Sequence, residues 1–291
     1  MSVAWLKNRF TDLKYTGWII KNWNYLRKGK YPLYPFFFYW FLYPIPRLVF
    51  GREKAIDVSR KIIKCFMNGN LIIPLPIKSL EVCYIALRDS VDFDAFREIC
   101  IEDHYNSSQI KKGMTVVDIG AHIGTFTLSV AKKAGKQGKV ITIEPELNNF
   151  TQLTRNLEIN KIKNVIPVNL ALSDFNGKGD FFVSKGSGCH SLLPREGENI
   201  INKIQVKIKT LDTLLEESNI TRIDLLKIDA EEAELKILKG AEKTLLKNPQ
   251  MKIVIAAYHS PNEAQEVVEY LKKLNFKPKI ILGNFTLVIV E

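Results

Sequence analysis

An aspartate and two glycines stand where a predicted strand meets a predicted helix. The stretch reads V-V-D-I-G-A-H-I-G-T-F-T and runs from Val116 to Thr127. Glycines at such a turn let the backbone approach a bound molecule closely, and an acid at the strand end favours positive charge in that molecule. The stretch therefore predicts a cofactor-binding loop. Its candidate residues are Asp118, Gly120, Ala121, His122 and Gly124.

Three kinds of cofactor can be compared with this loop. A phosphate-binding P-loop is excluded because it needs a lysine after its last glycine, whereas Thr125 follows Gly124. A dinucleotide fingerprint needs G-x-G-x-x-G, and one of those glycines is missing. The carboxylate of Asp118 would repel a pyrophosphate but suits S-adenosylmethionine, whose sulfonium and ammonium groups are cationic. Two alternatives stay open. Asp118 could cap the following helix, and the protein could be a dehydrogenase that binds a dinucleotide, which the loop favours less.

The next two predicted strands end in residues suited to a nucleoside. Glu144 closes the second strand twenty residues after Gly124, where an acid can accept both ribose hydroxyls. After the third strand, Leu172 could pack on the adenine ring, and Asp174 or a backbone group could meet its amino nitrogen. Asp174 could equally begin the turn toward Gly177. The pattern thus predicts an adenosine-binding crevice.

Acids and histidines suited to catalysis follow the later strands. Asp229, at the end of the predicted fourth strand, could bind the methionine ammonium of the cofactor or act as a base, and Glu231 and Glu234 follow it. Acids in the first turn of a helix are also favoured by its dipole alone. His190 lies in a glycine-rich loop and could act as a general base near neutral pH, and His259 follows the fifth strand. No ligand set is complete, so no metal site is predicted.

These residues fall at the ends of strands in a regular alternation of strands and helices. Such alternation predicts a mainly parallel sheet covered by helices on both faces. Only Gly283 and Asn284 separate the last two strands, which requires an antiparallel hairpin and hence one reversed strand. The predicted strands are 115–119, 140–144, 165–169, 223–229, 252–259, 277–282 and 285–290. The predicted helices are 125–134, 147–160, 232–246 and 262–274.

The N-terminal part of the chain differs in charge and texture. Residues 1–64 carry thirteen lysines and arginines against three acids, so this segment holds +10 of the net charge of +11. A basic amphipathic stretch, Val3–Lys30, precedes the uncharged aromatic run Tyr31–Pro46, which contains four prolines. The run is too short and too rich in proline for a spanning helix. Further on, the pattern predicts a helix over 52–67, strands within 71–87 and a helix over 93–105.

Three interpretations of the basic, aromatic segment remain open. The aromatic side chains could pack on the following domain. They could instead lie at headgroup depth while the lysines face anionic lipid, which predicts peripheral membrane contact through residues 1–50. Nucleic-acid binding has only the basic charge in its favour, since no RNA-binding module is recognisable. The four cysteines form no Cys-x-x-Cys pair, and with no signal-peptide pattern they favour a cytoplasmic protein, with the inner face of the membrane as the surface contacted.

Several blocks in a fixed order resemble the FkbM family of S-adenosylmethionine-dependent methyltransferases. They are V-V-D-I-G-A-H-I-G-T-F, I-E-P, N-L-A-L-S-D-F-N-G, G-S-G-C-H-S-L, K-T-L-D-T-L-L and I-D-L-L-K-I-D-A-E-E-A-E-L-K-I-L-K-G-A, spread over about residues 96–291. The resemblance implies a Rossmann-like class I methyltransferase fold and mostly O-methylation of sugars or other hydroxyl compounds. It also implies that the adenine lies beside Ala171–Asp174. Two positions depart from the family pattern, His122 in place of asparagine and Glu232 in place of glycine.

Together these observations predict a methyltransferase domain over 109–291, preceded by a basic, aromatic-rich region over 1–108. The domain is expected to hold a seven-stranded, mainly parallel sheet whose C-terminal strand is reversed. Its expected reaction is O-methylation of a glycan, lipid-linked sugar or related small molecule. A catalytically idle, membrane-associated binding protein and a nucleic-acid methyltransferase are the alternatives. The candidate catalytic residues are Asp229, Glu231 and His190.

Overall fold

The structure is a computed structural model that describes residues 71–75, 83–88, 90–101, 103–185, 187–194, 199–283 and 285–291. The chain divides into two compact units, Met1–Asn106 and Ser107–Glu291. The basic amphipathic stretch, the aromatic run and the helix predicted over 52–67 lie outside the described residues. Among the described helices, none has the length and the hydropathy needed to cross a bilayer.

The described part of the first unit holds a small hairpin and two helical turns. Strand β1 (Leu71–Leu75) pairs antiparallel with β2 (Cys83–Leu87). Helix α5 (Ser90–Phe96) continues as the π-helix η1 (Arg97–Ile101). The helix predicted over 93–105 therefore begins and ends earlier than its hydrophobic pattern indicated. Arg88 pairs with the fully buried Asp92 at 2.9 Å, which ties the end of β2 to α5.

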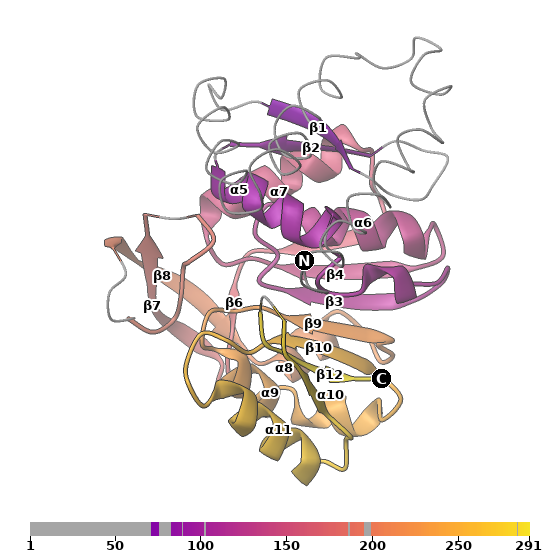
Figure 1. Ribbon diagram of the computed structural model, residues 1–291, viewed down its shortest axis with the longest axis vertical. Helices are drawn as coiled ribbons and strands as arrows, with labels where there is room; N and C mark the ends of the chain where they lie inside the picture. Colours follow the sequence, from indigo (N-terminus) through magenta and orange to yellow (C-terminus); the bar gives the residue numbers. More distant parts are fainter. Residues whose placement is uncertain are drawn as a thin grey trace, which may run out of the picture. The chain divides into compact units, whose positions relative to one another are not determined.

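The second unit is a doubly wound sheet of seven strands (Figure 1). Its order is β11-β12-β10-β9-β3-β4-β5, and every strand is parallel to its neighbours except β12, which is antiparallel to both β10 and β11. The predicted Rossmann-like class I fold with a reversed C-terminal strand is thus confirmed. The strands are β3 (Thr115–Ile119), β4 (Lys139–Ile143), β5 (Val165–Val168), β9 (Leu225–Ile228), β10 (Lys252–Ala256), β11 (Lys279–Ile281) and β12 (Leu287–Val290).

Helices cover both faces of this sheet, because its strands carry apolar side chains on both sides. On one face Val117, Ile228 and Ile255 belong to a buried cluster that includes residues of α8 (Leu211–Glu217), α9 (Glu234–Lys239), α10 (Glu242–Lys247) and α11 (Glu263–Lys273). On the other face α6 (Thr125–Ala134) packs on β3 and β4, and α7 (Leu147–Ile159) packs on β5. Figure 1 shows both sets of helices against the strands.

The strand order reverses between β3 and β9. From β3 the chain builds outward through β4 and β5, then returns to the other side of β3 as β9 and continues to β10. Ligands of open α/β sheets bind at such a switch point, beyond the carboxyl ends of the strands. The predicted loop after β3 and the acids after β9 both lie at this edge.

One local prediction was wrong. The helix predicted over 232–246 is divided into α9 and α10 at Gly240, where a side chain would come within 2.1 Å of the Ser173 carbonyl oxygen. Asp212 then accepts hydrogen bonds from the amides of Lys243 and Thr244, at 3.0 and 2.8 Å, which stabilises a new helix start.

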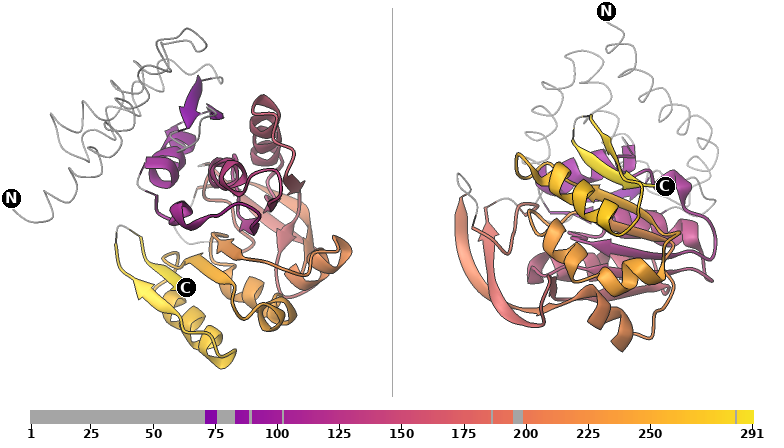
Figure 2. Two further views of the ribbon diagram at one scale, coloured as in Figure 1. Left: turned by 90° about the vertical axis from the view of Figure 1, so that its right-hand side faces the viewer. Right: turned by 90° about the horizontal axis from the view of Figure 1, so that it is seen from below.

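The long connection between β5 and β9 contains strands that the sequence pattern did not predict. It forms a second sheet in the order β6-β8-β7, from β6 (Ala171–Leu172), β7 (Gly177–Ser184) and β8 (Ile200–Lys209). Figure 2 shows β7 and β8 as a long hairpin at the side of the main sheet. Phe181, Val206 and Ile208 form a small core under this hairpin with Ala171.

Candidate active site

The glycine loop after β3 is shaped by close backbone packing. A side chain at Gly120 would lie 1.7 Å from the carbonyl oxygen of Asp229, so only glycine lets β9 end beside this loop. The amides of Gly120 and Ala121 both donate to the Ile143 carbonyl, at 3.0 and 3.1 Å. These two hydrogen bonds hold the loop against β4 and fix its backbone at the switch point.

In this loop, His122 and Gly124 have left-handed backbone conformations. Gly124, at the start of α6, has φ +85°, and a side chain there would contact Leu153 at 3.1 Å. His122 has φ +53°, which a non-glycine residue adopts at some cost. Its amide donates to the Glu144 carboxylate at 2.8 Å, and its Nε2 lies 3.2 Å from the Ser187 hydroxyl. The loop is thereby joined both to the end of β4 and to the segment after β7.

Glu144 is a buried acid at the carboxyl end of β4. Its two carboxylate oxygens accept hydrogen bonds from the amides of His122 (2.8 Å) and Glu146 (3.0 Å). Burial nevertheless raises the pKa of Glu144 to about 7, because removal from water outweighs those two hydrogen bonds. A carboxyl group in this condition is well placed to exchange hydrogen bonds with hydroxyl groups of a ligand.

Asp118 lies in a fully buried polar network on the face covered by α6. It stands opposite Thr142 of β4 and Lys227 of β9 in the sheet register. Its carboxylate accepts a 2.5 Å hydrogen bond from the Thr127 hydroxyl and lies 3.2 Å from Lys227 Nζ. This carboxylate accepts its hydrogen bond from the Thr127 side chain and not from a backbone amide of α6, so the helix-capping interpretation gains no support. Contact with the cofactor's ammonium group stays a prediction.

Lys227 was not predicted as a functional residue, yet it joins the two central strands. Its side chain is 2% exposed, and its Nζ donates to the carbonyls of Gly120 (2.8 Å) and Ile119 (3.2 Å). Burial lowers the pKa of Lys227, but Asp118 and Asp229 raise it more, so the ammonium stays charged. Its place before Asp229 in the K-I-D block was the available sequence signal.

The predicted adenine-side residues lie at the junction of the two sheets. Leu172 is buried in β6, which pairs with β8. Asp174 is exposed, and its carboxylate accepts a hydrogen bond from the Ser173 hydroxyl at 3.1 Å. Their contact with an adenine ring stays a prediction.

His190 lies on the hairpin beside β7. Its Nδ1 accepts a hydrogen bond from the Ser184 amide at 3.1 Å, and its ring stacks edge-on against Phe181. In a neutral imidazole the other nitrogen then carries the proton, so this bond must break before His190 can act as a base. Nearby, Ser187 is held by His122 and by the Asn149 side chain, which donates to the Ser187 carbonyl at 2.8 Å.

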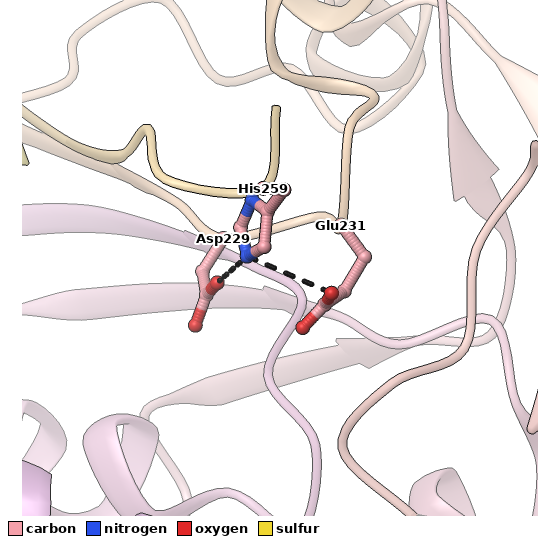
Figure 3. A group of neighbouring side chains, drawn as sticks. All are labelled: Asp229, Glu231 and His259. Atoms are coloured by element: carbon pink, nitrogen blue, oxygen red, sulfur yellow. Dashed lines mark ion pairs between the residues drawn. The ribbon is translucent and has the colours of Figure 1, made fainter. Parts of the chain in front are cut away.

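Asp229, Glu231 and His259 converge beyond the carboxyl ends of β9 and β10 (Figure 3). His259 Nε2 lies 3.8 Å from an Asp229 oxygen and 3.6 Å from a Glu231 oxygen. The His259 side chain is only 3% exposed, whereas 23% of Asp229 and 16% of Glu231 is exposed. The two carboxylates therefore reach solvent at the carboxyl edge of the sheet, and the imidazole is the buried member of the group.

Two more acids lie on the other side of the imidazole. His259 Nδ1 is 3.6 Å from Glu234 and 3.5 Å from Glu263. Burial raises the pKa of Glu234 well above its usual range. For His259 burial lowers the pKa, but the surrounding carboxylates, Glu263 first, outweigh it and bring it to about 9. The sequence placed His259 and Glu234 among the lesser candidates and did not single out Glu263, although Glu263 lies only four residues after His259.

Comparison with known proteins agrees with this arrangement. The sequence model of the methyltransferase FkbM domain matches residues 118–278, more than half of the chain, from the acid of the glycine loop to the start of β11. The chain belongs to the FkbM methyltransferase family. Membership confirms the prediction of a methyltransferase that uses S-adenosylmethionine as its cofactor.

Individual relatives of this FkbM chain are distant. Methyltransferase sdnD from Sordaria araneosa is 28% identical over 199 residues, which cover 58% of this chain and 76% of sdnD. Hexuronic acid methyltransferase AglP from Haloferax volcanii is 28% identical over 169 residues, covering 57% of this chain and just under two thirds (65%) of AglP. The solved methyltransferase FkbM from Methylobacillus flagellatus KT is 14% identical, with a TM-score of 0.47 over 69% of this chain and 54% of that one. The strand order, and not this last likeness, establishes the fold.

The residues present fit S-adenosylmethionine. Glu144 offers a buried carboxyl group for hydroxyls, and Asp229 and Glu231 offer partly exposed carboxylates for cationic groups. Lys227, which stands two residues before Asp229, is held by backbone carbonyls and Asp118 and so is not available to bind a phosphate. This donor set suits a ligand with ribose hydroxyls and positive charge.

Both departures from the family pattern fall at left-handed backbone. His122 has φ +53° where the family usually has asparagine, and Glu232 has φ +78° where it usually has glycine. Glu231 is also left-handed, with φ +54°. Two consecutive non-glycine residues in this region cost conformational energy, of order 1–3 kcal/mol each. The turn that presents Glu231 to the crevice is therefore strained.

Proposed function

We propose that the protein is an O-methyltransferase acting on a hydroxyl of a glycan, a lipid-linked sugar or a related small molecule. The observation that carries the proposal is the pair of partly exposed carboxylates, Asp229 and Glu231, at the switch point of the sheet. Asp229 lies directly against Gly120 of the cofactor loop. An acceptor held by these carboxylates would therefore lie beside the bound cofactor.

The chemistry asks little of the protein beyond alignment and removal of a proton. Bound S-adenosylmethionine would supply a methyl carbon that the acceptor oxygen attacks in line, while the sulfur leaves as the neutral thioether of S-adenosylhomocysteine. An alcohol must lose its proton in this step, and a carboxylate within hydrogen-bond reach can accept it. Asp229 and Glu231 can accept hydrogen bonds from sugar hydroxyls, which fixes the acceptor oxygen. His190 would take part only after release from the Ser184 amide.

A relative's name supports the class of acceptor. AglP is named a hexuronic acid methyltransferase, and the same kind of acceptor, a sugar that offers several hydroxyls, suits a crevice lined with carboxylates. The two alternative functions, nucleic-acid methylation and ligand binding without catalysis, are distinguished by the experiment described next. No feature of the described crevice favours either over sugar methylation.

Methyl transfer to defined acceptors tests the proposal. The full-length protein is incubated with methyl-labelled S-adenosylmethionine and, separately, with uronic acid glycosides, polyprenyl-linked sugars and RNA. The proposal expects label in a sugar fraction, and Asp229→Asn should reduce kcat at least about 100-fold. Glu232→Gln, which removes the same charge three residues away, should leave kcat within a factor of about two. Label in RNA alone, or cofactor binding without transfer to any acceptor, would replace this proposal with one of the two alternatives.

We further propose that residues 1–50 contact an anionic membrane surface, which would bring the enzyme to a lipid-linked acceptor. The support is the sequence alone: most of the chain's excess positive charge lies in residues 1–64, beside the aromatic run. Flotation with phosphatidylglycerol vesicles compares the full chain with a chain lacking residues 1–50. The full chain should float and the shortened chain should not. Equal flotation of both chains would refute the contact.

A further inference from the structure

Three side chains with metal-binding atoms meet at the edge of the sheet. Asp229 follows β9, Glu231 comes two residues later, and His259 follows β10, which is the parallel neighbour of β9. Their ligand atoms all lie within 4.8 Å of one another. Parallel neighbours end at the same edge, so the topology alone brings these residues together.

The imidazole is directed between the two carboxylates with no hydrogen bond to either. His259 Nε2 is buried and has no hydrogen-bond partner. Its distances to the Asp229 and Glu231 oxygens, 3.8 and 3.6 Å, exceed a hydrogen bond. Two ligands that each lie about 2.1 Å from one ion can be up to about 4.2 Å apart. Figure 3 shows the three groups turned toward a common point.

The far side of the imidazole is organised as the outer shell of a metal site. His259 Nδ1 faces Glu263 and Glu234, at 3.5 and 3.6 Å. Backbone amides fix both carboxylates: the His259 amide donates to Glu263 at 2.9 Å and the Ala230 amide donates to Glu234 at 2.7 Å. At these distances Nδ1 makes no hydrogen bond to either carboxylate. A small shift of the ring that lets Glu263 accept the Nδ1 proton would fix the tautomer in which Nε2 can bind a metal.

We propose that Asp229, Glu231 and His259 form a binding site for one divalent metal ion. Two carboxylate oxygens and one imidazole nitrogen suit Mn²⁺, Fe²⁺ or Zn²⁺ better than Ca²⁺, which takes oxygen ligands. Three protein ligands leave coordination positions open toward the crevice, where a hydroxyl group can bind. The proposal goes beyond the methyl transfer proposed above, since the site needs neither a methyl donor nor a particular acceptor.

The second group of ligating atoms, on Nδ1, is the less suitable site. Its carboxylates, Glu234 and Glu263, are 0% and 7% exposed and are already bonded to backbone amides. Lys227 Nζ lies 3.8 Å from Asp229 Oδ2, whereas Oδ1 is the Asp229 oxygen that faces His259 Nε2. The metal is therefore assigned to Nε2, with Glu263 and Glu234 as positioning residues.

Direct Mn²⁺ binding tests the site. The full-length protein is freed of metal with EDTA, dialysed and titrated with Mn²⁺ while electron paramagnetic resonance measures the free ion, with neither cofactor nor acceptor present. We expect one ion per chain, and a loss of affinity of at least about 10-fold in Glu231→Gln and in His259→Gln. Glu232→Gln is the matched control and should bind as the native chain does. Nitrogen coupling to bound Mn²⁺ should be present in the native chain and absent in His259→Gln.

Two results would overturn the proposal. One is the absence of Mn²⁺ binding by the native chain at millimolar concentration, which would leave the cluster as an ion-paired imidazole. The other is loss of binding in Glu263→Gln and Glu234→Gln with full binding in Glu231→Gln, which would move the ion to Nδ1. A thermal melt of each variant, with and without Mn²⁺, separates lost binding from lost folding, because a ligand raises Tm only where it binds the folded chain. Failure of methyl transfer has no effect on any of these measurements.

Discussion

Lys227 Nζ lies 2.8 Å from the carbonyl oxygen of Gly120, so the signature lysine of β9 holds the glycine loop of β3. The same ammonium lies 3.2 Å from the buried carboxylate of Asp118. The Lys227 side chain thereby connects the cofactor loop with strand β9, which Asp229 directly follows. The two halves of the crevice are fixed relative to each other by this contact.

Replacing this lysine should destabilise the fold. Lys227→Met leaves Asp118 as a buried charge without its cationic partner, which costs about 3–5 kcal/mol of unfolding free energy. Urea denaturation of the native chain and the variant measures the difference. The double variant Asp118→Asn with Lys227→Met should recover part of the loss, because no charge is then left unpaired. A single variant as stable as the native chain would show that the ion pair does not hold the loop.

Gly120→Ala should be far more damaging than the same change at Gly113. Both glycines have positive φ, but a side chain at Gly120 meets Asp229 at 1.7 Å, while one at Gly113 has nothing within 4 Å. Gly113→Ala therefore measures the cost of the backbone conformation alone, about 1 kcal/mol. Gly120→Ala adds the clash and should cost at least about 2 kcal/mol more. Equal unfolding free energies for the two variants would contradict the close approach of β9 to the loop.

Stability should depend on pH through Glu144. Burial raises the pKa of Glu144 from 4.5 to about 7, so the folded chain binds this proton more tightly than the unfolded chain does. The stabilisation is complete below the unfolded pKa of about 4.5 and is lost as pH rises through about 7. The Tm of the native chain relative to Glu144→Gln should therefore fall between about pH 5 and about pH 8. A difference in Tm that is constant over this range would show that Glu144 is not perturbed.

The strained turn after Asp229 predicts an unusual stabilising substitution. Glu232 has φ +78°, where glycine carries no steric penalty. Glu232→Gly and Glu232→Asn should match or exceed the native stability, by up to about 1 kcal/mol, whereas Glu232→Val should be destabilised by at least that amount. Thermal melts of the three variants give the order. If valine were tolerated as well as glycine, the left-handed conformation would not be required.

The main sheet could be predicted because its signals are local. Strand β3 and helix α6 have the predicted bounds, because the strand-like sequence T-V-V-D-I and a helical pattern of ten residues lie on either side of the glycine loop. The reversed strand β12 followed from a connection of two residues. The second sheet was not predicted, although polar and apolar residues alternate from Ile204 to Lys209 of β8, which is the pattern of a half-buried strand. Its pairing with β6 and β7 joins segments that are distant in sequence.

The site was predicted in its parts but not in its connections. Position at the end of a strand was enough to single out Glu144 and Asp229. The contacts of Lys227 with Gly120, and of His259 with Asp229, depend on the order of strands β3, β9 and β10 in the sheet. A single sequence contains no signal for such contacts between distant segments. The tertiary register decides them.

Calorimetric titration with S-adenosylmethionine, S-adenosylhomocysteine and NAD, on the native chain and on Glu144→Ala, tests the central claim most directly. The crevice described here should bind the first two with micromolar affinity and NAD not detectably. The Glu144→Ala variant should lose at least about 10-fold in affinity, because the ribose hydroxyls lose their buried hydrogen-bond partner. Binding of NAD alone, or affinity for S-adenosylmethionine that is unchanged in Glu144→Ala, would contradict this account of the crevice.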